Sequence, residues 1–276
     1  MAHVFSLWIG SPLSIYEKLP LISAQRFGHK FTLFCYESIE LPDGIILADA
    51  NNIIPMNQVR KVNNSFASFS NQFRYKVLQS NQFDAWVDMD IVFNSGTLPS
   101  RMDYIFGFEN RTIINNAVLG YPGESDLSEK LIQQSSHYEK KWGATGPALL
   151  TKLIQEERLS LHVQNKETFY PIDPWEVNFL LSTRKFSRVQ EKVKDSQTIH
   201  LWMDIFKRFG FKNNKLPPKN TYMRNMLEDF GLLDLDLPTM SRLELLKWRC
   251  RFYFGKSKHF VANIGRKIML TAGVPK

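Results

Sequence analysis

The sequence predicts an α/β fold with a mainly parallel central sheet, followed by a helical, basic C-terminal extension. Two observations lead to this prediction. Short apolar segments alternate with segments of helical spacing over the first hundred residues, and cations gather in the last quarter of the chain. With 43% hydrophobic and 22% charged residues, the 276-residue chain has an ordinary globular composition. We expect a main domain over residues 1–202 and the extension over residues 203–276.

The first three strands are expected in segments rich in β-branched and aromatic residues: VFSLWIG, KFTLFCY and GIILAD. Gly10 and Pro12 end the first of them, and a helix that runs through Gln25 separates it from the second. Strands that alternate with helices usually lie parallel in one sheet. Because ligands of such sheets bind at the carboxyl ends of the strands, those ends are where a site is expected.

The next helix is expected between Phe66 and Val77, where four apolar residues recur at helical spacing. Residues 63–65 offer N-cap side chains before it, and Asn81 ends it. DAWVDMDIVF then reads as a strand that runs into a loop. A helix-rich half follows, with helices expected at about 127–141, 146–157, 175–181 and from about 241, and with a linker at Pro217–Pro218.

The chain start lacks the basic stretch and long apolar segment of a secretion signal. No window reaches about 18 uninterrupted apolar residues, so no transmembrane helix is expected. Cys35 and Cys250 are too few for a disulfide framework, and a reduced cytosolic compartment is the simpler interpretation.

The charge is uneven along the chain. Residues 1–202 hold 20 Lys or Arg against 21 Asp or Glu, whereas residues 203–276 hold 15 against 6. The basic end therefore favours an acidic partner, either a nucleic acid or an anionic bilayer. No nucleic-acid readout motif accompanies the charge, so we expect no nucleic-acid partner.

Within this basic end, the segment RLELLKWRCRFYFGKSK mixes apolar residues with cations at helical spacing. Such a helix suits an anionic membrane surface, and equally suits packing on its own domain with a solvated basic face. The residues concerned are the apolar Leu243, Leu246, Trp248 and Phe252 and the basic Arg242, Lys247, Arg249 and Arg251.

Two acids separated by one residue, Asp88 and Asp90, directly follow the apolar part of the fourth strand. A turn there would aim both carboxylates at one hard cation such as Mg²⁺ or Mn²⁺. Spacing alone leaves two alternatives open. The acids can be solvated loop charges, or the first motif of a haloacid-dehalogenase-like phosphatase, although that motif normally opens its domain.

Seven segments, taken together and in order, resemble glycosyltransferase family 32 over about residues 5–202. They are FSLWIG, SNQFRYKVL, VDMDIV, INNAVLG, WGATGPALLTKLI, FYPIDPWE and TIHLW. The resemblance implies a GT-A type nucleotide-binding sandwich with an acid-x-acid metal motif. It also implies a sugar-nucleotide donor and an α-linked product formed with retention.

On the donor side, the resemblance implies that Trp8 stacks on the base, as an alternative to a core tryptophan. Asn71 and Arg74, three residues apart on one helix face, would reach the donor sugar. Most relatives have Asp at the place of Asn71 and a Gly-Gly pair at residues 82–84, so the donor sugar is left open. Asn115 matches an asparagine near donor and acceptor, or is a turn-capping amide.

On the acceptor or phosphate side, Gly146 opens a helix whose N-terminus would face phosphate or acceptor oxygens, or is only a well-built helix start. Asp173 and Trp175 would line the acceptor side. His200 would complete the metal shell with the two acids, and its neutral imidazole suits Mn²⁺ better than Mg²⁺. A structural role for this histidine beside Trp202 is the alternative.

These expectations add up to a retaining glycosyltransferase that uses Mn²⁺ or Mg²⁺ at Asp88, Asp90 and His200. It would move a hexose or N-acetylhexosamine from a UDP-sugar, with a GDP-sugar as the alternative donor, to a cell-surface glycan or lipid-linked glycan, as in lipopolysaccharide or capsule. The basic end places it in the cytoplasm, peripheral at the inner face of the membrane. The alternatives are a haloacid-dehalogenase-like phosphatase and an inactive membrane-associated binding protein of the same fold.

Overall fold

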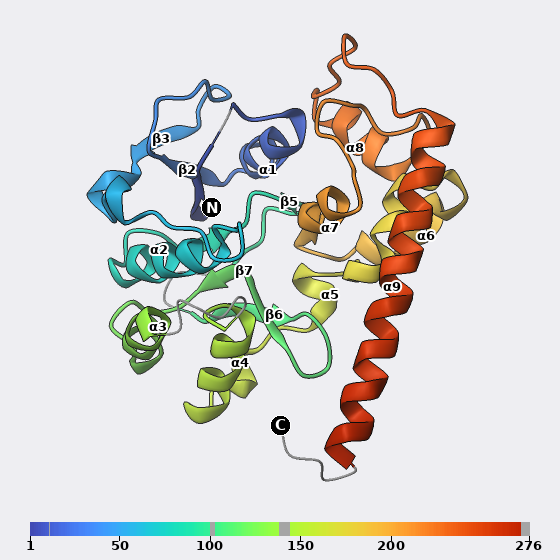
Figure 1. Cartoon of the computed structure of the whole chain (residues 1–276). Helices are drawn as coiled ribbons and strands as arrows, with labels where there is room; N and C mark the ends of the chain where they lie inside the picture. Colours follow the sequence, from blue (N-terminus) through green and yellow to red (C-terminus); the bar gives the residue numbers. More distant parts are fainter. Residues whose placement is uncertain (11, 100–102, 138–143, 272–276) are drawn as a thin grey trace.

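The centre of the computed structural model is a six-stranded sheet in the order β3-β2-β1-β4-β7-β6 (Figure 1). The structure describes residues 1–10, 12–99, 103–137 and 144–271, with the side chains of 259 and 261–271 left aside. The strands of this sheet are β1 (His3–Trp8), β2 (Lys30–Cys35), β3 (Ile46–Asp49), β4 (Ala85–Val87), β6 (Ile105–Phe108) and β7 (Ile114–Gly120).

The expected α/β fold with a mainly parallel sheet is confirmed. β3, β2, β1 and β4 run parallel to one another, whereas β7 is antiparallel to both β4 and β6. The central strands β1, β4 and β7 are buried or nearly so along their length, and β1 and β4 have the mostly apolar sequences typical of such strands, whereas β7 carries two asparagines. The carboxyl ends of β1 and β4 lie at the same edge of the sheet, and the antiparallel β7 begins at that edge.

The segment DAWVDMDIVF differs from the single strand that was expected. It forms β4, a turn through the two acids, and then a second strand, β5 (Ile91–Phe93). β5 leaves the main sheet and pairs antiparallel with β8 (Thr198–His200), so that Ile91 lies opposite His200. This pairing brings chain segments more than a hundred residues apart to one point.

The helices follow the expected order. The α-helices are α1 (Ile15–Arg26), α2 (Ala67–Gln79), α3 (Asp126–His137), α4 (Pro147–Glu156), α5 (Lys166–Phe169), α6 (Phe186–Val193), α7 (Met203–Arg208), α8 (Tyr222–Asp229) and α9 (Arg242–Thr271). Short 3-10 helices are η1 (Ala50–Asn52), η2 (Met56–Gln58), η3 (Ser160–His162), η4 (Pro174–Leu181) and η5 (Thr183–Lys185).

Two details of the helix predictions are corrected. The expected helix at 175–181 is the 3-10 helix η4, and residues 138–141 of the expected helix at 127–141 lie outside the described residues. At the start of α2, the N-cap residue is Phe66, whose side chain makes no capping hydrogen bond. Ser65 Oγ instead accepts a hydrogen bond from the Ala67 N–H at 3.2 Å.

Figure 1 shows α2, α3 and α4 grouped on one side of the molecule and α6 to α9 on the other, with α9 as a long helix along the edge. A buried apolar cluster joins this second group to the first half of the chain. It includes Tyr16 of α1, Val92 of β5, Phe206 of α7 and Trp248 of α9. The core therefore continues across residue 202.

The four apolar residues expected on one stripe of α9 do not form one stripe. Trp248 and Phe252 are buried and stack on each other at 5.2 Å between ring centroids, whereas Leu243 and Leu246 are exposed. The reason is geometric: at about 100° per residue, the two pairs lie on opposite sides of the helix. One side of α9 packs on the domain and the other faces out.

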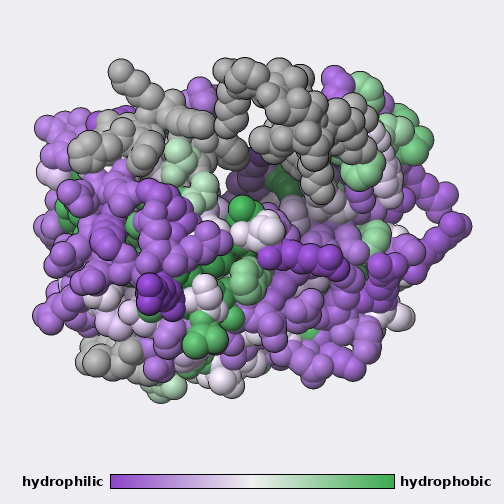
Figure 2. Space-filling view, turned by 90° about the horizontal axis from the view of Figure 1, so that it is seen from below, coloured by the Kyte–Doolittle hydropathy of each residue, from purple (hydrophilic) through white to green (hydrophobic). Residues whose placement is uncertain are grey.

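No helix in the described part of the chain is both long and apolar enough to cross a membrane. Both cysteines are free, Cys35 buried and Cys250 exposed. Seen from below, the surface is mostly hydrophilic, with a small hydrophobic area near its middle (Figure 2).

Candidate active site

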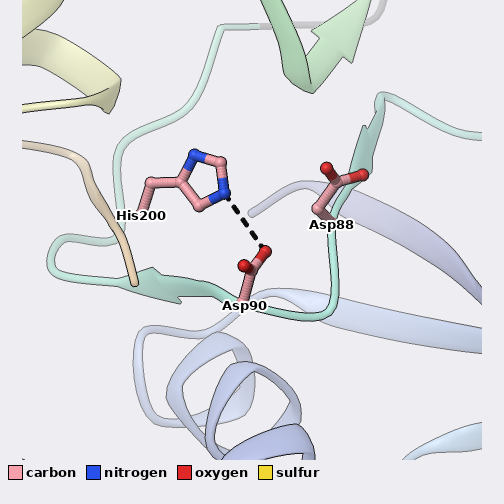
Figure 3. A group of neighbouring side chains, drawn as sticks. All are labelled: Asp88, Asp90 and His200. Carbon is pink, nitrogen blue, oxygen red and sulfur yellow. Dashed lines mark ion pairs between the residues drawn. The ribbon is translucent and has the colours of Figure 1, made fainter. Parts of the chain in front are cut away.

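The two acids of the turn after β4 lie at the carboxyl end of that strand, as expected. The Asp88 N–H donates to the Ala117 carbonyl of β7 at 2.8 Å, which continues the sheet by one residue, and the Ile91 N–H donates back to the Asp88 carbonyl at 3.0 Å. This tight turn presents both carboxylates on the same side of the chain, and both are half-buried (Figure 3).

His200 reaches the acids from β8. Its Nε2 lies 3.2 Å from Asp90 Oδ1, and the Leu201 N–H donates to the Asp90 carbonyl at 2.9 Å (Figure 3). The imidazole is buried and stacks on Trp202, with ring centroids 3.8 Å apart. Burial alone would lower the pKa of His200, but the charge of Asp90 raises it above its ordinary value.

Asp90 is held on its other side by the start of α7. The Met203 N–H donates to Asp90 Oδ2 at 2.8 Å, as expected of an anion at a helix N-terminus. Burial alone would raise the pKa of Asp90, but the charge and hydrogen bond of His200, with the Met203 N–H, hold it below its ordinary value. Asp90 is therefore a carboxylate at neutral pH.

Asp88 is held by α2 and by its own strand. Arg74 Nη2 lies 3.1 Å from Asp88 Oδ1, and the indole Nε1 of Trp86 donates to the same oxygen at 2.6 Å. Burial raises the pKa of Asp88 above its ordinary value, against the opposing charge of Arg74. A second cation beside this carboxylate would favour its charged form.

The donor set suits a divalent cation. One ligand atom from each of Asp88, Asp90 and His200 can be chosen so that all lie within 4.8 Å of one another. Two carboxylates and an imidazole match Mn²⁺ better than Mg²⁺, which prefers oxygen alone. Among the described residues, His200 Nδ1 has no hydrogen-bond partner, so the ring is held mainly through Nε2 and its stacking. The residues present fit a metal of this class.

The two acids open into a cleft of about 350 Å³. Its walls come from β1, α1, α2, the acid-bearing turn and α7, and the chemically active residues among them are Trp8, Glu17, Arg74, Asp88, Asp90 and Lys207. Trp8 is half-buried at the carboxyl end of β1, which leaves part of its ring to the cleft. The cleft thus combines an aromatic face, a carboxylate pair and cations.

Lys207 is a cleft residue that the sequence interpretation missed. Its Nζ lies 3.1 Å from Glu17 Oε1, and its charge helps to hold the pKa of Asp90 low. Glu17 is buried and also accepts from Asn213 Nδ2 at 2.8 Å. In the sequence, Lys207 is only a lysine seven residues after His200. Its place in the cleft cannot be predicted without knowing that β5 pairs with β8.

Asn71 lies beside the cleft and not in its wall. Its Nδ2 donates to Thr145 Oγ1 at 3.1 Å, and its Oδ1 accepts from Asn116 Nδ2 at 2.9 Å. Asn71 is 6% exposed. Contact with a donor sugar, as the sequence predicts, would require the amide to leave these partners. Arg74, by contrast, lines the cleft and donates from Nη1 to the Asn116 carbonyl at 2.5 Å.

Gly146 is the N-cap of α4 and borders the same polar network. A Cβ added at Gly146 would lie 3.0 Å from Asn71 Nδ2 and 3.5 Å from Asn116 Nδ2. The glycine therefore permits a close approach of the helix start to these amides. Asn116, the neighbour of the predicted Asn115, is the residue of β7 that joins this network.

Asn115 points to a different partner. Its Nδ2 donates to Glu109 Oε2 at 2.8 Å, and its Oδ1 accepts from the Ala117 N–H. The negative charge of Glu109 in turn contributes to the raised pKa of His200. Asn115 thus orients an acid near the site, and Glu109 is a second residue that the sequence interpretation missed.

Asp173 and Trp175 lie apart from the cleft wall. Asp173 forms an ion pair with Lys166 at 2.8 Å and occupies the N-cap of η4. The Trp175 ring lies 5.9 Å from that of Phe252, centroid to centroid, which places it against α9. The structure therefore does not bring these two residues together with the acids.

A model of the alpha 1,4-glycosyltransferase conserved region matches residues 124–226. No curated protein matches the chain. The matched stretch is more than a third of the chain and runs from just before α3 into α8, so it contains His200 and Lys207. Asp88 and Asp90 precede it in sequence and meet it in space. The resemblance seen in the sequence is confirmed over residues 124–202, and the match continues to residue 226, beyond the stretch where the resemblance was expected to end.

Proposed function

We propose that the chain is a glycosyltransferase, which the match to the alpha 1,4-glycosyltransferase conserved region supports, and that it transfers a sugar from a nucleoside diphosphate donor with the help of a divalent cation. The donor is a UDP-sugar, with a GDP-sugar as the second choice, and carries a hexose or N-acetylhexosamine. The acceptor is a glycan of the cell surface, free or lipid-linked. One observation carries the proposal: Asp88, Asp90 and His200 converge within 4.8 Å at a cleft.

The cation site supports this proposal through its position. Asp88, Asp90 and His200 would hold Mn²⁺, or Mg²⁺ less well, at the cleft. When bound, such a cation neutralises the charge that develops on a departing diphosphate. Arg74 fixes Asp88, and the Met203 N–H fixes Asp90, so both carboxylates are oriented before any ligand binds.

The remaining cleft residues each bind a different part of the donor. Trp8, at one wall, offers its ring to the nucleotide base. Lys207, near Asp90, offers an ammonium group to the phosphates, and Glu17 holds that ammonium in place until they arrive. Asn71 and Gly146 allow α2 and the start of α4 to pack closely behind the site, and they act as positioning residues.

Retention of configuration needs no side-chain nucleophile in this proposal. The bond from the anomeric carbon to the phosphate oxygen breaks, and a bond from the acceptor oxygen forms on the same face of the sugar. The acceptor proton passes to the departing phosphate oxygen. The chain's residues orient the two reactants and screen the charge of the leaving group.

The test is release of nucleoside diphosphate from a panel of UDP- and GDP-sugars by the full chain, after chelation and after Mn²⁺ or Mg²⁺ is added back. We expect slow hydrolysis of at least one donor that requires the cation, greater with Mn²⁺. Simple phosphomonoesters such as 4-nitrophenyl phosphate are assayed in parallel. Phosphomonoester hydrolysis without donor cleavage would favour the phosphatase, and donor cleavage in the absence of metal would refute the cation site.

A further inference from the structure

The outward side of α9 carries a continuous apolar stripe. Its members are exposed over 50% to 65% of their surface, and they are Leu243, Leu246, Tyr253, Phe254 and Phe260. At about 100° per residue they fall within an arc of roughly 120°, with the exposed Cys250 between them. The stripe is about 25 Å long at a rise of 1.5 Å per residue.

The opposite side of the same helix holds it on the domain. Trp248 Nε1 donates to the Phe206 carbonyl at 3.1 Å, and the Trp248 ring stacks between Phe206 and Phe252. Arg249 Nη2 donates to the Leu181 carbonyl at 3.0 Å. The helix is therefore anchored, and its apolar stripe is presented in a fixed direction.

Cations border the stripe along its length. Lys247, Arg251 and Lys258 follow one edge, and Lys258 lies over the Phe254 ring at 4.6 Å. Arg242 lies at the other edge, and the sequence holds no acid after Glu244. Glu244 itself is ion-paired with Lys215. An apolar stripe with a positive rim, whose one acid, Glu244, is paired with a lysine, matches a surface that is apolar inside and anionic outside.

A basic pocket opens beside the stripe. It has a volume of about 140 Å³ and lies between α9 and the segment after α7. Its lining holds one carboxylate, that of Glu244, and four cations, which are Lys212, Lys215, Lys247 and Arg251. In the described part of the chain, Lys215 alone of these forms an ion pair, with Glu244. The size and charge of this pocket suit one phosphate group.

We propose that this face of α9 docks on an anionic lipid bilayer. The stripe enters the boundary of the acyl chains, and the basic pocket receives the phosphate of a lipid head group. A bilayer fits both features at once, because its phosphates stand directly above its apolar interior. This surface shares no residue with the cleft, so the proposal does not depend on the reaction.

The test is co-sedimentation of the full chain with vesicles of phosphatidylcholine alone or with 30 mol% phosphatidylglycerol. We expect binding that requires the anionic lipid and weakens with salt. Leu246→Ser with Phe254→Ser removes the stripe, and Lys247→Gln with Arg251→Gln removes the pocket cations; each pair lowers the bound fraction by at least about tenfold. Leu161→Ser, at a residue 97% exposed, and Lys219→Gln are the matched controls and bind as the parent does.

Three outcomes overturn the proposal. The first is equal sedimentation of the parent and both variant pairs, with melting temperatures showing that all are folded. The second is no vesicle binding together with a dimer, seen by sedimentation equilibrium, that the Leu246 and Phe254 changes dissociate; the stripe is then an interface between copies. The third is binding of duplex DNA or free phosphate without binding of vesicles.

Discussion

Arg74 and Asp88 form a partly buried ion pair, with Nη2 and Oδ1 3.1 Å apart, although they come from a helix and from a strand end. The same guanidinium lies over the ring of Trp86, 4.3 Å from its centroid. Its Nη1 donates to the Asn116 carbonyl. One planar side chain thus ties α2, β4 and β7 together at the point where the first acid leaves the sheet.

Because a lysine ammonium cannot reproduce this fork, Arg74→Lys is expected to lower donor turnover by about 10- to 100-fold, the usual effect of a residue that orients a metal ligand. The affinity for Mn²⁺, measured by thermal shift, should fall with it. Arg111→Lys, at an exposed turn, is the control and keeps both values. Unchanged turnover in Arg74→Lys would show that Asp88 needs no such support.

Substitution of a metal ligand should remove the stabilisation by Mn²⁺ while the chain still folds. The parent chain should melt at a higher temperature with Mn²⁺, since a ligand at 100 times its Kd stabilises by about 2.7 kcal/mol. Asp88→Asn, Asp90→Asn and His200→Gln should each lose most of this gain. Asp236→Asn, on a loop far along the chain, keeps it. If the three variants respond to Mn²⁺ as the parent does, the cation binds elsewhere.

Lys207 is expected to recognise the phosphates of the donor. Lys207→Met should raise the inhibition constant of UDP by about 10- to 100-fold, as a lost charged hydrogen bond does, and leave that of uridine unchanged. Lys207→Arg should recover part of the affinity. Lys219→Met serves as the control. An equal loss of affinity for UDP and for uridine would mean that Lys207 does not contact the phosphates and acts only by its ion pair with Glu17.

The strands β1, β2 and β4 were predictable because they are buried and read as apolar runs, from VFSLWIG to the strand that carries Asp88. The edge strand β3 is mostly exposed and was predicted from its composition alone. The acids were predictable for the same reason as β4, since the strand stops where the polar residues begin. What the sequence lacks is long-range pairing. Nothing near Val92 or Ile199 indicates that β5 leaves the main sheet for β8, yet this pairing alone sets His200 beside Asp90.

The direction in which side chains point could not be predicted from the sequence either. Spacing places Asn71 and Arg74 on one face of α2, but Arg74 reaches the cleft while Asn71 turns to Thr145 and Asn116. On α9, the spacing is equally compatible with either face packed inward. The domain selects the Trp248 face because a stacked pair of large rings fills the space beside Phe206.

Asn71 should therefore matter for stability more than for donor affinity. Asn71→Ala removes the hydrogen bond to Thr145 Oγ1 and the stronger of the two acceptors of Asn116 Nδ2. It is expected to lower the free energy of unfolding by about 1–3 kcal/mol, with the KM for donor within about twofold. Urea denaturation and donor kinetics measure the two effects. Asn57→Ala, at an exposed residue, is the control. A large rise in KM without loss of stability would place Asn71 on the donor.

Glu244, at the start of α9, is expected to make a pH-dependent contribution to the stability of the fold. A hydrogen bond and ion pair with Lys215, with bonds to Ser241, lower the pKa of Glu244 from 4.5 to about 2. A carboxyl with a lower pKa in the folded state stabilises the fold above its unfolded pKa, and this contribution is lost as the pH falls toward the folded value.

Glu244→Gln should consequently lower the melting temperature at pH 7, by no more than about 4 °C because the pair is partly exposed to solvent. The difference from the parent should narrow as the pH is taken from 5 to 3, where the unfolded carboxyl gains its proton first. Glu228→Gln, on an exposed part of α8, gives the background change over the same range. A constant difference between Glu244→Gln and the parent from pH 7 to pH 3 would mean that the charge of Glu244 does not stabilise the start of α9.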